Sequence, residues 1–447
     1  MKKSKIALII GICSVCLAVA APATIGIISF AKQVAGDVIE ETKEKALSPT
    51  FPVSGDEVDI LKPQVTKYIA AMHEQAKPIE NDYVLHDFYV MAPDTAQNYG
   101  EVYSNETDLV RIDDYWEGSS NNSKSKKVAL VFDSVGFPSN TIYTVRYGMK
   151  EDLSDARTVT TSEKYATIEN LYSNRTYYWQ VSVGTISSTI ESFMTKEGFR
   201  MITASGVNNI RDMGGRSVYG GKHIKQGLIY RGAELVEETY KDVSNGSTHT
   251  KTLNEENKAI LRDDLGIKLE IDFRGDDESN NLVHSPLYDE NYQDIDYMRI
   301  PNMAGYDWFF SIDDETNKAR VHDMFVAFAN AESKPIYFHC WGGADRTGTA
   351  GFMLGAILGM SLTDLIVDFE LTSFSGNFRP HYSNDGKKIY RFPSLLAKLK
   401  LATKPGSKET YWSPNKPIAD IVAEMLNDKF GVTPSEIAAI RAALLED

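Results

Sequence analysis

Cys340 and Arg346 lie on either side of a short turn that contains Gly342 and Gly343. The turn follows the apolar run Ile336-Tyr337-Phe338 and leads into a second apolar run, so the sequence predicts a strand, a turn and a helix in that order. Such a turn directs successive backbone N–H groups at one point, and the helix N-terminus adds about half a positive charge there. We therefore expect an anion-binding cradle around the cysteine.

The same cradle favours the thiolate form of the cysteine, so one loop would hold both the nucleophile and the anion. We expect Cys340 to attack phosphorus and form a thiophosphate, while Arg346 binds two equatorial oxygens in a bidentate manner. Thr347 is predicted to donate its hydroxyl to the sulfur, and His339 to hydrogen-bond the loop backbone. The alternative is a cysteine buried in the core, but a core cysteine would not require the glycines and the arginine that surround it.

The string from His339 to Gly348 resembles the signature of the cysteine-dependent protein tyrosine phosphatases, and more narrowly the bacterial tyrosine and lipid phosphatases with His-Cys-x-x-Gly-Lys-Asp-Arg-Thr-Gly. Three segments, at 208–215, 227–232 and 271–274, also match segments of those enzymes, and the resemblance covers about residues 198–447. It implies an α/β domain with a central sheet flanked by helices, and hydrolysis of a phosphotyrosine-like monoester. Arg231 and Arg274 are expected to form structural ion pairs, and Asp212 to pair with an arginine.

In this superfamily the proton donor is usually an aspartate about thirty residues before the cysteine. Asp307, 33 positions upstream, is the predicted general acid, and Asp313 and Asp314 are alternatives. The resemblance implies that the rest of the loop binds substrate, with Asp345 expected to be mainly structural and Trp341 either flanking the cleft or packing. These substrate-binding residues are Trp341, Gly342, Gly343, Ala344 and Asp345.

Ala344 stands where the family often has lysine, which removes a cation that could meet further phosphates. Phosphoinositide or phospholipid substrates are therefore the second hypothesis. No metal or other cofactor is expected, because the histidines show no metal-ligand spacing.

The N-terminus predicts a membrane anchor. Lysines precede an uncharged stretch of 26 residues from Ile6 to Ala31, and acidic residues follow it. This length suffices to span a bilayer, and the flanking charges predict that the rest of the chain is outside the cell. A cleaved signal peptide at the small residues 18–23, and hence secretion, is the alternative. Residues 1–36 are assigned to this segment.

Residues 37–82 are predicted to form a stalk with one helix, which Pro63 would begin. Residues 83–197 contain short runs rich in β-branched and aromatic residues at 128–132, 142–147 and 176–181, as in an all-β sandwich. The stretch from Leu171 to Trp179 resembles the tyrosine-corner region of a fibronectin type III domain. The predicted domains are thus an anchor, a stalk, a fibronectin III-like module with an unknown ligand, and a phosphatase domain at 198–447.

The chain has 447 residues and a formal net charge of −15, which argues against nucleic acid as a partner. Outside the apolar N-terminal stretch Cys340 is the single cysteine, so a disulfide framework is excluded. A hypothesis of another class is a cell-surface binding protein in which the phosphatase domain is vestigial.

Overall fold

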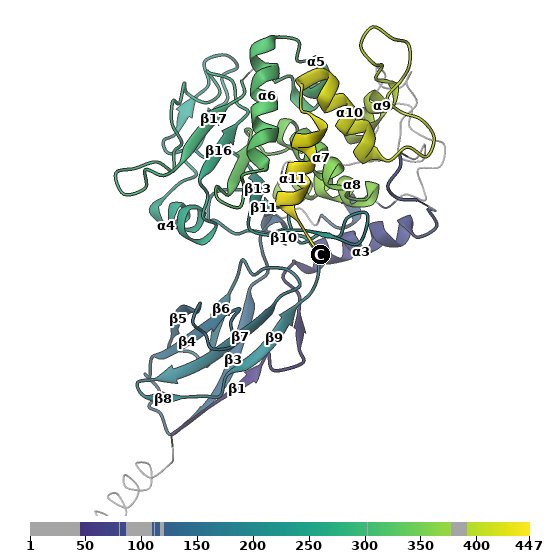
Figure 1. Cartoon of the computed structure of the whole chain (residues 1–447). Helices are drawn as coiled ribbons and strands as arrows, with labels where there is room; N and C mark the ends of the chain where they lie inside the picture. The colour runs from purple at the N-terminus through teal and green to yellow at the C-terminus, as the bar shows by residue number, and fades with distance from the viewer. Residues whose placement is uncertain are drawn as a thin grey trace, which may run out of the picture. The chain divides into compact units, whose positions relative to one another are not determined.

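The computed structural model describes residues 45–79, 81–85, 110, 112–116, 120–301, 303–376 and 391–447. These residues form two compact units (Figure 1). The β unit consists of the described residues within 1–56, 129–167 and 176–193. The α/β unit consists of the described residues within 57–128, 168–175 and 194–447. The predicted anchor or signal lies outside the described residues. Within the described ranges, no helix combines the length and the apolar character that crossing a membrane requires.

Two sheets make up the β unit, with strand order β1-β3-β6 in one and β9-β7-β4-β5 in the other. Buried and less buried residues alternate along β4 and β7, so one face of each strand enters the core. Trp179 is fully buried there, and its indole donates a hydrogen bond to the carbonyl of Pro52 (2.8 Å). The three strands predicted from the sequence are confirmed. The strands are β1 (Ala46–Phe51), β3 (Val128–Val135), β4 (Tyr143–Gly148), β5 (Arg157–Thr161), β6 (Tyr165–Ile168), β7 (Thr176–Val183), β8 (Ile186–Ser187) and β9 (Glu191–Thr195).

A six-stranded sheet of order β10-β11-β13-β18-β16-β17 is the centre of the α/β unit. Strands β13, β18, β16 and β17 are parallel, and β10 and β11 extend the sheet antiparallel. Gly232 and Asp272 both pair with His339, so three parallel strands end side by side at one edge. The strands of this sheet are β10 (Arg200–Met201), β11 (Arg211–Asp212), β13 (Ile229–Gly232), β16 (Leu269–Asp272), β17 (Asp296–Arg299) and β18 (Ile336–His339). Short strands outside it pair as β12 (His223–Ile224) with β19 (Leu445–Glu446), and β14 (Tyr240–Lys241) with β15 (Thr248–His249). Strand β2 (Glu57–Val58) pairs with β9.

Both faces of this sheet are covered, as a parallel sheet requires. Tyr230 and Tyr337 lie in an apolar cluster with Leu261 and Leu265, while Phe338 packs on Phe328 of α6 (ring centroids 6.1 Å apart). The helical segments are α3 (Pro63–Ala76), η5 (Ile112–Asp114), η6 (Ser120–Ser123), α4 (Glu255–Ala259), the π-helix η7 (Ile260–Asp264), η8 (Gly305–Asp307), α5 (Trp308–Ser311), α6 (Glu315–Phe328), α7 (Arg346–Leu358), α8 (Leu362–Glu370), η9 (Leu371–Ser375), α9 (Arg391–Leu401), α10 (Ile418–Phe430) and α11 (Pro434–Leu444).

The helix predicted in the stalk is present as α3, but it does not stand alone as a spacer. Its apolar stripe is buried, and Tyr68 packs edge-on against Phe374 of η9 (5.9 Å). His73, near its end, contacts Asp364 of α8 (2.9 Å). The reason is the stripe itself, because an apolar helix face is stable only when another element covers it. Strand β1 also lies inside the predicted stalk, so this segment contributes to both units.

Candidate functional site

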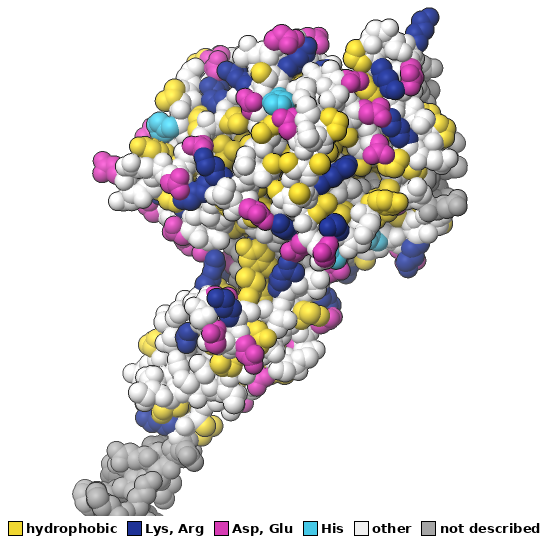
Figure 2. Space-filling view, viewed as in Figure 1, with side chains coloured by type: hydrophobic (Ala, Val, Ile, Leu, Met, Phe, Trp, Pro, Cys, Tyr) yellow, Lys and Arg dark blue, Asp and Glu magenta, His cyan; other side chains and the backbone are white. Residues whose placement is uncertain are grey.

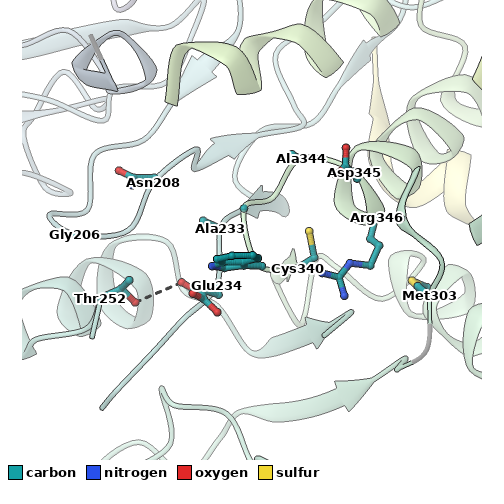
Figure 3. Close-up of a pocket in the computed structure, with 13 residues that line it drawn as sticks. Gly206, Asn208, Ala233, Glu234, Thr252, Met303, Cys340, Ala344, Asp345 and Arg346 are labelled. Carbon is teal, nitrogen blue, oxygen red and sulfur yellow. Dashed lines mark hydrogen bonds between the residues drawn. The ribbon is translucent and has the colours of Figure 1, made fainter. Parts of the chain in front are cut away.

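The loop from Cys340 to Asp345 connects β18 to α7 at the edge where the parallel strands end. A cavity of about 560 Å³ opens over it (Figure 3). In open sheets of this kind ligands bind outside the carboxyl ends of the strands. The cavity is lined by Gly206, Asn208, Ala233, Glu234, Thr252, Met303, Gly305, Cys340, Trp341, Gly342, Ala344, Asp345 and Arg346.

Gly343 is the loop position at which only glycine fits. Its φ is +66°, and a Cβ atom there would lie 2.2 Å from the carbonyl oxygen of Gly232. Asp345 occupies the N-cap position of α7 without a side-chain capping bond. The first N–H groups of a helix have no partner within the helix, so this end of α7 is a potential anion site.

Cys340 is 3% exposed and lines the cavity beside Arg346. The Arg346 guanidinium donates two hydrogen bonds to the carboxylate of Glu278 (2.6 and 2.5 Å) and one to the carbonyl of Phe273 (3.0 Å). Burial alone would lower the pKa of Arg346, but Glu278 and the charge at Cys340 outweigh it and raise the pKa. Glu278 thus fixes one edge of the guanidinium.

Glu278 itself is held in its charged form. Burial favours the neutral acid, but the hydrogen bonds and charge of Arg346 lower the pKa of Glu278 below its ordinary value. Glu278 is not recognisable from the sequence, because nothing in the local pattern around it indicates a partner 68 positions away.

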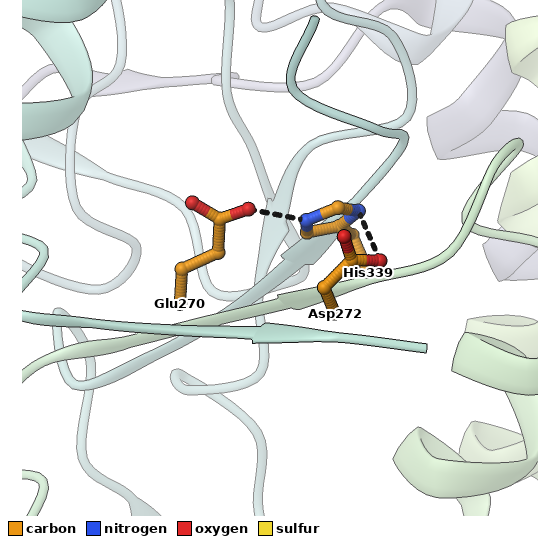
Figure 4. A group of neighbouring side chains, drawn as sticks. All are labelled: Glu270, Asp272 and His339. Carbon is orange, nitrogen blue, oxygen red and sulfur yellow. Dashed lines mark hydrogen bonds and ion pairs between the residues drawn. The ribbon is translucent and has the colours of Figure 1, made fainter. Parts of the chain in front are cut away.

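His339 lies behind the cysteine, between Glu270 and Asp272 of β16 (Figure 4). One ring nitrogen is 2.8 Å from a Glu270 carboxylate oxygen, and the other is 3.2 Å from the carbonyl of Cys340. Burial would lower the pKa of His339, but Asp272 and Glu270 raise it overall. Both nitrogens face oxygen acceptors, so the ring serves as a doubly donating imidazolium that holds the loop backbone.

Glu270, Asp272 and His339 also place three ligand atoms within 4.8 Å of one another, a spacing that a metal could bridge. Their oxygens and nitrogens are already hydrogen-bonded: Asp272 contacts the guanidinium of Arg274 (2.8 Å), and Glu270 accepts from Ser285 and contacts His339. An arginine inside the group disfavours a second cation. The contacts fit a structural hydrogen-bond network.

The charge of His339 gives a pH-dependent contribution to stability. A pKa raised above the unfolded value of about 6.5 stabilises the fold below that pH, and this stabilisation is lost as the pH rises through the folded pKa. We expect the free energy of unfolding of wild type to exceed that of His339→Gln by more at pH 6 than at pH 9, because the charged ring stabilises the fold at the lower pH. Urea denaturation at the two pH values measures this difference. A gap independent of pH would mean that His339 is uncharged.

Thr347, predicted for catalysis, and Trp341, predicted for substrate binding, differ in their surroundings. Thr347 is fully buried, and its hydroxyl has no hydrogen-bond partner in the described part of the chain. Trp341 lines the cavity, is 43% exposed and packs on the ring of His249 (5.1 Å). His249 stacks in turn on Tyr240 (4.8 Å), so the β14–β15 hairpin supports this wall.

Asp307, the predicted general acid, is not among the residues that line the cavity. Its carboxylate pairs with the ammonium group of Lys398. Trp308 next to it donates its indole N–H to the carbonyl of Arg346 (3.0 Å), which fixes η8 along α7. Of the two alternatives, Asp314 caps α6 by accepting from the N–H of Asn317 (2.8 Å), and Asp313 lines a different cavity. Asp345 is the aspartate that lines the cavity over Cys340.

The predicted ion pairs are present. Asp212 pairs with Arg200 (2.9 Å), Arg231 with Asp368 (2.6 Å) and Arg274 with Asp272 (2.8 Å). The sequence analysis did not single out Asp368. A signal was available, since Asp368 interrupts the apolar run of α8, and a buried charge requires a partner.

Among curated proteins, the chain is 25% identical over 179 residues to a predicted tyrosine-protein phosphatase of Cupriavidus necator. This match covers 36% of the chain and spans 59% of the relative's length. Among solved structures, the core catalytic domain of the PP-IP phosphatase SIW14 from S. cerevisiae, in complex with citrate, matches at 14% identity. It covers 42% of this chain and 86% of that chain with a TM-score of 0.23, too low to carry an argument. A model of the tyrosine phosphatase family matches residues 202–446, more than half of the chain, and the chain therefore belongs to that family.

Proposed function

We propose that the chain hydrolyses phosphate monoesters of the phosphotyrosine type through a covalent phosphocysteine at Cys340. The observation that carries the proposal is the cavity in which Cys340 and Arg346 face a glycine-containing loop at a helix N-terminus. The membership in the tyrosine phosphatase family supports it.

Two displacements make up the reaction. The Cys340 thiolate forms the S–P bond while the P–O bond to the substrate breaks, and the leaving oxygen takes a proton from an acid. Arg346 and the loop N–H groups hold the equatorial oxygens, whose charge they stabilise in the transition state. Water then attacks phosphorus and gives a proton to the carboxylate that the acid has become, the S–P bond breaks, and the sulfur leaves as a thiolate. The unpartnered hydroxyl of Thr347 could donate to that sulfur.

Asp345 is the acid that we propose in place of Asp307. It lines the cavity with Cys340, whereas Asp307 does not and is paired with Lys398. Glu234 also lines the cavity, but its carboxylate is held by Arg274 (3.0 Å) and by His249 of the β14–β15 hairpin (2.6 Å), so it belongs to the network that supports the cavity wall. Asp345 is therefore the better placed donor to a leaving oxygen.

Two asparagine variants separate the candidate acids. Asp345→Asn is expected to lower kcat for an aryl phosphate by about 10²- to 10⁴-fold, the usual contribution of a general acid. Asp345 makes no side-chain capping bond and asparagine has nearly the same size, so α7 should be unaffected. Asp307→Asn is the matched control and should change kcat by less than about threefold. Steady-state kinetics on both variants gives the answer, and the reverse order of effects would restore Asp307 as the acid.

Charge around the cavity favours a substrate with a single phosphate. Arg346 is the one cation among the described residues that line the cavity, which also include the acidic Glu234 and Asp345. Ala344 adds no charge where the family often has lysine. A second phosphate would meet carboxylates rather than ammonium groups. On the face shown in Figure 2, basic side chains are interspersed with acidic ones, and no broad basic surface gathers there.

Comparing two substrates with the full-length chain tests the proposed function. A phosphotyrosine peptide and a phosphoinositide are supplied at equal concentration, and phosphate release is measured with and without vanadate. Vanadate-sensitive release that is faster from the peptide is expected. Faster release from the phosphoinositide would favour lipid phosphatase activity, and no release from either would favour the binding-protein hypothesis.

The remaining proposals concern the rest of the chain. The β unit is proposed to be a fibronectin III-like binding module, supported by its two sheets and the buried Trp179. Residues 1–36 are proposed to anchor the chain in the cell membrane with the catalytic unit outside, supported by the charge pattern of the sequence. Determining the N-terminal residue of the protein recovered from membranes would distinguish an anchor from a cleaved signal.

A further inference from the structure

The outer side of the catalytic loop contains carbonyl groups that must be satisfied inside the protein. A trans peptide is planar, so its N–H and C=O point in opposite directions. If the N–H groups of Gly343 and Ala344 face the anion, the carbonyls of Gly342 and Gly343 face the interior. A buried carbonyl without a donor costs about 1–3 kcal/mol.

One side chain supplies donors to both carbonyls. The amide nitrogen of Asn209 lies 3.2 Å from the oxygen of Gly342 and 3.1 Å from that of Gly343. A guanidinium nitrogen of Arg231 donates a second hydrogen bond to Gly343 (3.1 Å). Asn209 is 1% exposed and Arg231 is fully buried, so water does not reach these carbonyls from that side.

Asn209 is itself held by a closed circuit of side chains. Its carbonyl oxygen accepts a hydrogen bond from Arg211 (2.6 Å), and Arg211 donates to Asp368 (3.0 Å). The other oxygen of Asp368 accepts from Arg231 (2.6 Å), which returns to the loop at Gly343. Burial would raise the pKa of Asp368, but Arg211 and Arg231 hold it well below its usual range, so the circuit stays charged.

The chemistry of the position fits asparagine in particular. The backbone of Asn209 has φ +61°, a left-handed conformation that asparagine and glycine tolerate well. Its amide nitrogen shares two N–H donors among the two loop carbonyls and the hydroxyl of Thr372 (3.2 Å), and its oxygen accepts from Arg211. Aspartate would keep the acceptor but turn a negative oxygen toward the two carbonyls.

We propose that Asn209 is a positioning residue that sets the orientation of the peptide groups in the catalytic loop. By keeping the carbonyls of Gly342 and Gly343 turned inward, it keeps the N–H groups on the same peptides turned to the bound phosphate. This inference rests on the proposed function, since it assigns those N–H groups to oxyanion binding. Without the amide, a peptide can rotate and place a carbonyl oxygen in the cradle, where it repels the anion.

Asn209→Asp in the full-length chain tests the proposal, because it changes one donor to an acceptor at constant size. The inhibition constants for vanadate and for inorganic phosphate are expected to rise about 10- to 100-fold, as for loss of a buried hydrogen bond. Protection of Cys340 against alkylation by iodoacetamide should require a correspondingly higher concentration of inorganic phosphate than in wild type, because fewer N–H groups hold the anion over the sulfur. If Asn209 had a purely structural role, the variant would melt at a lower temperature, but its inhibition constants and the alkylation of Cys340 would be unchanged.

Asn317→Asp is the matched control. Asn317 is also buried, and its amide donates to Asp314 on α6 (3.2 Å), outside the loop. This variant should bind vanadate like wild type. Asn209→Gly, which keeps the left-handed backbone and removes the donors, is the second variant and should show the same change as Asn209→Asp if the latter does not fold.

Two results would overturn the proposal: unchanged vanadate affinity and unchanged protection of Cys340 from alkylation in a folded Asn209 variant, or an equal loss in Asn317→Asp. Failure of the proposed function looks different. In that case the wild-type protein itself would release no phosphate from an aryl phosphate. Oxyanion binding and Cys340 alkylation could still be compared between wild type and variant, and they would still report the orientation of the loop.

Discussion

Cys340→Ser is expected to lower kcat/KM for an aryl phosphate by roughly 10⁴-fold or more. Serine keeps the size and shape of the side chain but is not ionised at neutral pH, so the S–P bond cannot form. The cavity is otherwise unchanged, since Arg346 and the loop N–H groups remain. The measurement is steady-state hydrolysis of a chromogenic phosphate by the full chain.

The control for the Cys340→Ser variant is phosphate binding, which should persist although turnover is lost. Inorganic phosphate should still protect the Cys340→Ser protein against thermal unfolding, because a ligand that binds the folded state stabilises it. Turnover near the wild-type rate would remove the cysteine from the mechanism. Loss of both turnover and phosphate binding would point to a damaged loop.

Arg346→Lys has the second largest expected effect, a loss of about 10²- to 10³-fold in kcat/KM, comparable to removing an oxyanion donor. The guanidinium of Arg346 uses two nitrogens on the carboxylate of Glu278 and must still offer N–H groups to the phosphate. A lysine ammonium is a point charge without the planar fork, so it cannot serve both partners in this geometry. Most of the loss is expected in kcat, since the interaction strengthens in the transition state.

Arg441→Lys provides the matched control for this substitution. Arg441 donates to the carbonyl of Ile357 at the opposite end of α7 (2.6 Å). Arg441→Lys is the same substitution at another residue that contacts α7, and activity should stay within about twofold of wild type. Equal losses in both variants would mean that the helix, and not the anion, is affected.

Much of the α/β unit could be predicted because its signals are local. The apolar run before Cys340 forms β18, and the turn and helix follow as expected. The Thr-x-x-Glu spacing of Thr433 and Glu436 predicts a capping box, which is present at the start of α11. Thr252 and Glu255 have the same spacing, but the capping box that it predicts is not formed. Asn254 caps α4 instead, because its side chain accepts from Asn257 and the helix begins at Glu255.

The partners of the loop were not predictable, because tertiary packing brings them from far along the chain. Glu278 meets Arg346 across 68 positions, and Asp368 meets Arg211 across 157. Sequence spacing also suggested Asp307, which has the expected separation from the cysteine. Spacing alone does not give the contacts of a side chain: the Asp307 carboxylate pairs with Lys398, and Asp307 is not among the described residues that line the cavity.

Cys340 is the single cysteine in the described part of the chain, and this has a consequence for redox damage. A thiolate attacked by peroxide becomes a sulfenic acid, which many enzymes rescue by forming a disulfide with a neighbouring thiol. The described residues offer no such resolving thiol. Within the described residues, condensation with a backbone nitrogen to a sulfenamide is the route left to protect such a sulfenic acid from further, irreversible oxidation to the sulfinic acid.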